Sequence, residues 1–217
     1  MKFTKKITFL LIIIFLLLST WQFFETTFWL VVKSSKLYLW FSIGIVIYII
    51  IRRLSFLRKN AKWFETWTHE LIHTIVGLLF LQKIHSFRAG DGAGEIYHSG
   101  HFSRNIFISL APYCLPIYTY IFCILRLLSA SKSLWIFDLM IGLTLAFHVV
   151  CFLKQTRSYQ TDIREFGLIT SYFYIASFQL FNATIVLLTI KVGIWNAFIY
   201  QTTHFWKIII YCLNYMM

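Results

Sequence analysis

Long apolar runs, separated by short polar or basic segments, fill almost the whole of this 217-residue chain. Most of the runs are close to the about 20 residues that cross a bilayer as a helix. The pattern predicts an all-α fold, a polytopic membrane helical bundle of six or seven spans. The last run is interrupted by polar residues at 201–204 and could instead lie in the membrane interface. The runs cover residues 7–24, 37–51, 63–81, 106–128, 134–153, 166–190 and 192–213.

Composition supports the membrane interpretation. Hydrophobic residues make up 59% of the chain and charged residues only 13%, and the mean hydropathy is +0.72. A soluble domain has about a quarter charged residues, so this chain lacks the polar surface that a water-facing globule needs. Two prolines and nine glycines favour long helices over a barrel of short strands. No repeat or linker interrupts the pattern, which predicts a single integral-membrane domain over residues 1–217, with a core at about 63–174.

The net charge of +12 does not indicate nucleic-acid binding, because the basic residues lie at the ends of apolar runs or between them. Anionic lipid of the bilayer is the expected partner. The basic segment 2–6 followed by an apolar run resembles a signal peptide without a cleavage site, and we interpret it as an uncleaved anchor. The dense positive loop at 52–62 predicts that this loop and the N-terminus are cytoplasmic. Lys83 and Arg88 then fall on the opposite side.

The strongest chemical signal is the motif Thr68-His69-Glu70-Leu71-Ile72-His73. Two histidines four residues apart lie on one face of a helix, so both imidazoles can bind one metal ion, for which Zn²⁺ is the natural choice. Glu70 beside them is the candidate catalytic base that takes a proton from water. The motif leads into the apolar run 74–81, and ionisable groups in such a setting usually signal function. The competing interpretation is a chance match in a structural helix.

A zinc site with an open position needs a third protein ligand, and His, Asp and Glu are the usual choices. Asp138 lies near the start of one apolar helix and Asp162 at the start of the next. His148 is a further candidate, although a hydrogen bond to a helix neighbour is the favoured explanation for it. Position along the chain does not decide between Asp162 and the alternative third ligand Asp138.

The segment after the motif helix has a different pattern. Two short alternating runs joined by a glycine-rich turn predict a β-hairpin from Lys83 to Gly100. A free strand edge can hold an extended peptide by main-chain hydrogen bonds, which makes this hairpin a candidate substrate-binding element. A hairpin that only connects two helices is the alternative.

The order of these elements resembles the site-2 protease family of intramembrane zinc metallopeptidases, in particular its small, divergent bacterial members. The resemblance covers residues 63–174 and rests on the motif helix, the β-like segment, Leu110-Ala-Pro-Tyr113 at the start of a helix, and an Asp between two later apolar helices. By order and setting, Asp162 matches the family's Asp. The chain lacks the Asn and Pro of that family stretch and has Ile163 where the family has Gly.

The resemblance implies a zinc ion bound by His69, His73 and Asp162, with water activated by Glu70. The predicted function is an intramembrane zinc metalloendopeptidase of a bacterial cytoplasmic membrane, which cuts a membrane-embedded or membrane-adjacent segment of another protein. Two alternatives belong to other classes. The missing Asn and Pro allow a catalytically inactive scaffold or binding protein with the same fold, whereas a transporter is disfavoured because no repeated halves are visible.

Overall fold

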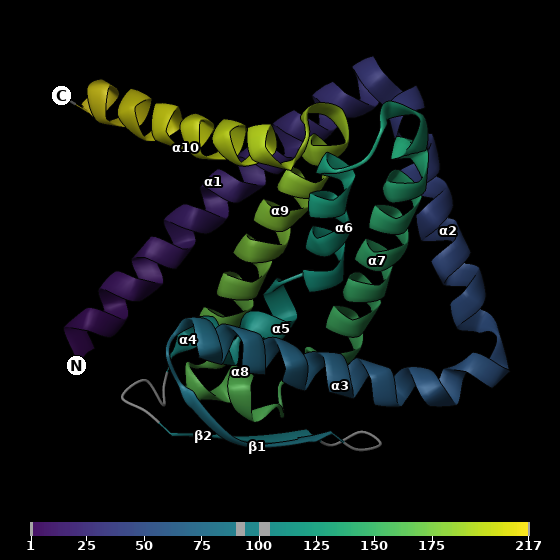
Figure 1. Cartoon of the computed structure of the whole chain (residues 1–217). Helices are drawn as coiled ribbons and strands as arrows, with labels where there is room; N and C mark the ends of the chain where they lie inside the picture. Colours follow the sequence, from purple (N-terminus) through teal and green to yellow (C-terminus); the bar gives the residue numbers. More distant parts are fainter. Residues whose placement is uncertain (1, 90–93, 100–104, 217) are drawn as a thin grey trace.

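The computed structural model describes residues 2–89, 94–99 and 105–216, which are mostly helical. Helices α2, α6, α7 and α9 stand side by side, and α1 packs along α9 at a tilt (Figure 1). A 3-10 turn at Ser35–Tyr38 reverses the chain between α1 and α2. The bounds are α1 Lys2–Ser34, α2 Leu39–Arg53, α6 Ile117–Leu127, α7 Leu134–Gln155 and α9 Leu168–Val192.

Two helices lie across this upright group rather than along it. Helix α3 (Ser55–Leu79) crosses one end of the bundle, and α10 (Ile194–Met216) projects sideways near the opposite end (Figure 1). Three short helices lie at the same end as α3: α4 (Ile106–Ser109), α5 (Ala111–Cys114) and α8 (Thr161–Glu165). We call this end of the molecule the α3 end.

Within the described residues, three stretches are long and apolar enough to cross a membrane: Lys6–Arg53, Ser131–Gln155 and Leu168–Val192. The sequence predicted six or seven spans, and the described residues do not support that number. The predicted runs 7–24 and 37–51 belong to one continuous stretch, and 134–153 and 166–190 match the other two. The runs 63–81, 106–128 and 192–213 are not among these candidates.

The physical reasons differ for each of these runs. Helix α3 has a polar first half that includes Lys62 and Glu65, and it lies across the upright helices. The run at 106–128 is broken around Pro112 and Pro116, which leaves α6 with only 11 residues. Such a helix is about 16 Å long, well short of a bilayer core of about 30 Å. Helix α10 also lies crosswise to the upright helices (Figure 1).

Side chains of α9 stabilise the break between α5 and α6. Gln179 donates from Nε2 to the carbonyl oxygen of Tyr113 at 2.5 Å, and Asn182 donates from Nδ2 to that of Cys114 at 2.9 Å. These bonds satisfy carbonyl groups that a continuous helix would have paired internally. Helix α9 therefore stabilises the break between α5 and α6.

The two runs predicted as strands do form strands, β1 (Lys83–Ala89) and β2 (Gly94–Ser99). They pair antiparallel with Lys83 opposite Ser99 and Ala89 opposite Gly94, and the register shifts between Ile84 and Ser86. The predicted turn residues 90–93 and Gly100 lie outside the described residues. The small sheet lies against α3, so it belongs to the α3 end.

The tightest helix contact is between α2 and α7, where each helix contributes a glycine. A Cβ on Gly44 would lie 2.0 Å from the carbonyl oxygen of Leu139, and a Cβ on Gly142 would lie 2.0 Å from that of Phe41. Both distances are far below van der Waals contact with rigid backbone. The two backbones therefore approach each other at a distance that only glycine permits.

We predict that Gly44→Ala lowers the free energy of unfolding by about 1–3 kcal/mol, because the added methyl group pushes α2 away from α7. Thermal unfolding of the detergent-solubilised protein measures the change. Ser42→Ala, which adds no volume at an exposed position of the same helix, is the control. An unchanged unfolding temperature for Gly44→Ala would show that the α2–α7 contact is looser than described.

Candidate metal centre

Helix α3 presents one face to the bundle, and this face carries both motif histidines. His73 is buried, and Ile72 and Val76 pack with Ile108 and Ala111 of the short helices α4 and α5. The spacing of four residues places the His69 ring one turn from that of His73. Their ring centroids are 4.9 Å apart, and the two Nε2 atoms are 3.2 Å apart.

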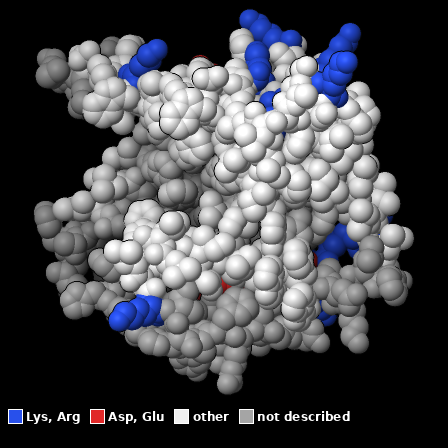
Figure 2. Space-filling view, in the orientation of Figure 1, with Lys and Arg blue, Asp and Glu red and all other residues white. Residues whose placement is uncertain are grey.

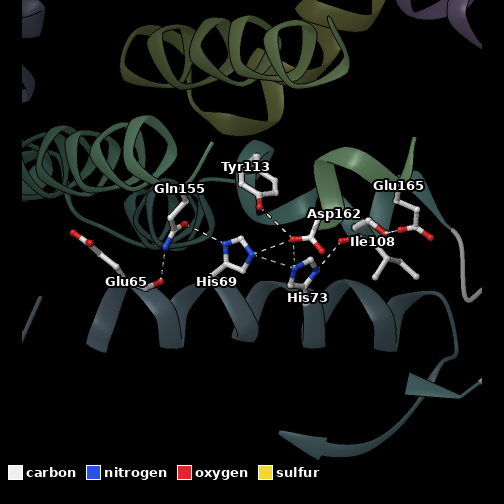
Figure 3. A network of polar contacts seen from close by, with 9 residues as sticks. Glu65, His69, His73, Ile108, Tyr113, Gln155, Asp162 and Glu165 are labelled. Atoms are coloured by element: carbon white, nitrogen blue, oxygen red, sulfur yellow. Dashed lines mark hydrogen bonds and ion pairs between the residues drawn. The ribbon is translucent and has the colours of Figure 1, made fainter. Parts of the chain in front are cut away.

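Asp162 of α8 brings a carboxylate to the same point (Figure 3). Its Oδ2 atom lies 3.6 Å from Nε2 of His69 and 3.6 Å from Nε2 of His73. Among the described residues, these three side chains form the group of His, Cys, Asp and Glu whose ligand atoms are close enough to share one metal ion. The structure therefore brings Asp162, 89 positions after His73 in the chain, to the motif histidines.

The spacing of the three ligand atoms suits zinc. Atoms that are each about 2.0–2.1 Å from a tetrahedral zinc ion lie about 3.3–3.4 Å from one another. The observed separations of 3.2, 3.6 and 3.6 Å bracket this value. Three protein ligands leave the fourth position open, which is the arrangement of a hydrolytic rather than a structural zinc site.

The outer nitrogen of each ring has its own partner, and these partners define the tautomers. Nδ1 of His73 lies 2.9 Å from the carbonyl oxygen of Ile108, and Nδ1 of His69 lies 3.1 Å from Oε1 of Gln155. A carbonyl oxygen only accepts hydrogen bonds, so each Nδ1 carries the proton and donates it. In the neutral rings, both Nε2 atoms are then left with lone pairs.

Three electron-pair donors thus face one point without a proton between them. Two Nε2 lone pairs 3.2 Å apart and a carboxylate oxygen would repel one another unless a positive charge lay among them. An additional proton on one ring or a bound cation would supply that charge. The donor set of two imidazoles and one carboxylate is typical of zinc, so the residues fit this metal.

Helix α8 is anchored to the bundle, and this anchoring fixes Asp162. The hydroxyl of Tyr113, whose side chain is fully buried, donates to Oδ2 of Asp162 at 3.2 Å. Ile163 is fully buried in the adjacent core, and Ser171 donates to its carbonyl oxygen at 2.8 Å. Ile163 stands where the family resemblance led us to expect Gly, and its buried side chain belongs to the same core cluster as Tyr113, which ties α8 to the bundle.

The electrostatics of the two carboxylates differ. Burial raises the pKa of Asp162, but His69 and His73 outweigh burial when one ring carries the additional proton, and that pKa then lies well below its usual range. Glu70 is buried as well, and burial raises its pKa, which the two histidines lower again in part. Asp162 therefore has the character of an anionic ligand, and Glu70 that of a carboxylate able to exchange a proton.

The other two candidate ligands lie elsewhere. Asp138 accepts a hydrogen bond at 2.7 Å from Nε of Arg126. It is 17 positions before Gln155 on α7, or about 25 Å along the helix. The alternative assignment of Asp138 as third ligand is therefore wrong, because this carboxylate is committed to an ion pair at the other end of the bundle. His148 contacts Nε2 of Gln179 at 3.0 Å instead of the histidine pair.

Sequence reasoning gave no role to Gln155, to Tyr113 or to the carbonyl group of Ile108. Gln155 lies at the end of an apolar helix, 86 positions after His69, and its contact with that ring depends on how α7 packs. Tyr113 stood within a quoted motif, Leu110 to Tyr113, but nothing in the motif indicated that its hydroxyl reaches a carboxylate. A main-chain carbonyl has no sequence signature at all.

We predict that the purified protein binds about one zinc ion per chain and that Asp162→Asn abolishes tight binding, because an amide oxygen replaces the anionic ligand. Asp138→Asn is the matched control, the same change in a carboxylate far from the histidines, and it should retain the metal. Elemental analysis after dialysis measures zinc per chain. Equal zinc content in the two variants would contradict the assignment of Asp162.

Comparison with known proteins identifies the family. No curated protein and no solved structure gave a significant match. A family model described as Peptidase M50B-like matches residues 42–211, which include α3, α8 and the whole of the candidate metal centre. Since this match covers most of the chain, the protein belongs to the Peptidase M50B-like family and is a member of the site-2 protease group of membrane peptidases.

Proposed function

We propose that this protein is a zinc-dependent membrane endopeptidase that cuts segments of other membrane proteins where they reach the membrane boundary. The observation that carries the proposal is the convergence of His69 Nε2, His73 Nε2 and Asp162 Oδ2 on one point, at separations that suit zinc. Membership of a peptidase family and three long apolar stretches support the reaction class and the membrane setting.

In the proposed mechanism, His69, His73 and Asp162 hold the zinc ion. When bound, zinc polarises the scissile carbonyl group and makes water more acidic. Glu70 acts as the general base: it takes a proton from the attacking water and later donates it to the leaving amine. Its burial suits this task, because a raised carboxyl pKa makes Glu70 a stronger base towards the attacking water.

The position of the centre indicates where cleavage would occur. It lies at the α3 end, where α7 has ended and α9 has not yet begun, rather than midway along the upright helices (Figures 1 and 3). A substrate segment would reach this depth as it leaves the bilayer. The sheet of β1 and β2 lies against α3, and we propose that one of its edges holds the substrate as an extended strand.

The distribution of charge supports a cytoplasmic location for the α3 end. Figure 2 shows Lys and Arg near both ends of the face drawn. The basic segments 52–62 and 154–164 both belong to the α3 end, and so do the N-terminus and the sheet (Figure 1). Lys83 and Arg88 were assigned to the opposite side only because α3 was predicted to span. Because α3 lies crosswise, both residues belong to the same end of the molecule as the other basic segments. The positive-inside rule then favours a cytoplasmic location for the α3 end.

We predict that Glu70→Gln lowers the rate of proteolysis at least about 100-fold and leaves zinc bound, because the amide cannot accept the proton from water. Cleavage of a membrane-protein substrate in vesicles or detergent, with a chelator control, measures the rate. Glu25→Gln on α1 is the matched control and should cleave normally. Full activity of the Glu70 variant would refute its role as base, and a zinc-loaded wild-type protein that cuts nothing would favour the inactive scaffold.

A further inference from the structure

Gln155, the last residue of α7, bridges two successive turns of the metal helix. Its Oε1 accepts the Nδ1 proton of His69, and its Nε2 donates to the main-chain carbonyl oxygen of Glu65 at 3.2 Å (Figure 3). Residue 65 is four positions before 69, so both contacts fall on the same face of α3. The second contact defines which end of the amide faces the ring, since only the NH₂ group can donate to a carbonyl oxygen.

Ion pairs fix the segments of α3 and α7 between which Gln155 forms this bridge. The carboxylate of Glu65 forms ion pairs with Arg52 of α2 and with Nζ of Lys154, the neighbour of Gln155 on α7, and the Lys154 pair is 3.3 Å long. The side chains of Glu65 and Arg52 are only 8% and 14% exposed, so their ion pair is shielded from water. Helices α2, α3 and α7 are thereby tied together beside the point where Gln155 meets His69.

The described side chains around the Gln155 amide are mostly apolar or already hydrogen-bonded. A small cavity beside the bond is walled largely by apolar side chains, among them Ile72, Leu115 and Phe147. Its hydroxyl groups already have partners: Thr68 pairs with the hydroxyl of Tyr118 at 3.2 Å, and Thr144 donates to the carbonyl oxygen of Met140. Loss of the Gln155 acceptor would therefore remove the hydrogen-bond partner that the Nδ1 proton of His69 has in this structure.

We propose that Gln155 is the positioning residue for the zinc ligand His69: its amide oxygen fixes the tautomer and the direction of the ring, so that Nε2 faces the metal. This inference rests on the zinc site of the proposed function. Outer hydrogen-bond partners of ligating histidines orient the ring and raise its basicity, and their loss typically weakens metal binding by about 10–100-fold.

The test is zinc affinity of the full-length protein in detergent, measured by competition with a chromogenic chelator. Gln155→Leu should weaken binding by about 10–100-fold, because the ring loses its acceptor. Gln155→Glu keeps an acceptor and should remain within a few-fold of wild type. Gln22→Leu makes the same change in a fully buried glutamine where α1 meets α10, far from the histidines, and should not change the affinity. The absorption spectrum of the cobalt-loaded protein should change for Gln155→Leu alone.

The outcomes separate this inference from the proposed function. If the wild-type protein binds no zinc, the proposed function fails. If wild type binds zinc and Gln155→Leu binds it within about twofold, only the positioning role is overturned. If Gln155→Leu and Gln155→Glu weakened zinc binding equally, the positioning role would also be overturned, because the hydrogen-bond acceptor would then not be the group that matters. Should Gln155→Leu fail to fold, Gln155→Asn withdraws the oxygen by one methylene and should show the same weakening.

Discussion

The site depends on one electrostatic constraint: three electron-pair donors point at the same small space. The carbonyl oxygen of Ile108 and the amide oxygen of Gln155 take the outer protons of the two rings, so both inner nitrogens are left as acceptors. The carboxylate of Asp162 completes the set at 3.6 Å from each. Such an arrangement is unfavourable by itself and would become favourable with a cation, or an additional proton on one ring, among the three donors.

The rest of the fold holds these donors in place. Helix α3 crosses the end of the bundle, and the segments that meet its histidine face come from the short helices α4 and α5, the end of α7, and α8. Each is anchored separately: α8 by the buried Ile163, α7 by its close contact with α2 at Gly44 and Gly142, and the α5–α6 break by α9. The centre is therefore positioned by packing at the end of the bundle rather than by a single loop.

Local patterns in the sequence predicted the parts of the site that depend on local geometry. The spacing of His69 and His73 alone places two rings on one helical face, and alternation predicted strands at β1 and β2. Asp162 was identified through the resemblance to a family, since position left Asp138 equally open. Hydropathy did not predict how α3 is oriented relative to the other helices. The run at 63–81 is apolar enough to suggest a membrane span, but α3 lies across the upright helices. This orientation changes both the number of spans and the side assigned to Lys83. Gln155 and Tyr113 act through tertiary contacts that a single sequence does not reveal.

The most direct test of the account is the zinc coordination shell of the purified protein, measured by X-ray absorption at the zinc edge. We expect one zinc ion per chain with two imidazole nitrogens and oxygen ligands at about 2.0–2.1 Å and no sulfur. In His73→Ala, the imidazole signal per chain should fall to half or less, because only His69 remains as an imidazole ligand. A shell that contains sulfur, or one that is unchanged in that variant, would contradict the central claim that His69, His73 and Asp162 bind the metal.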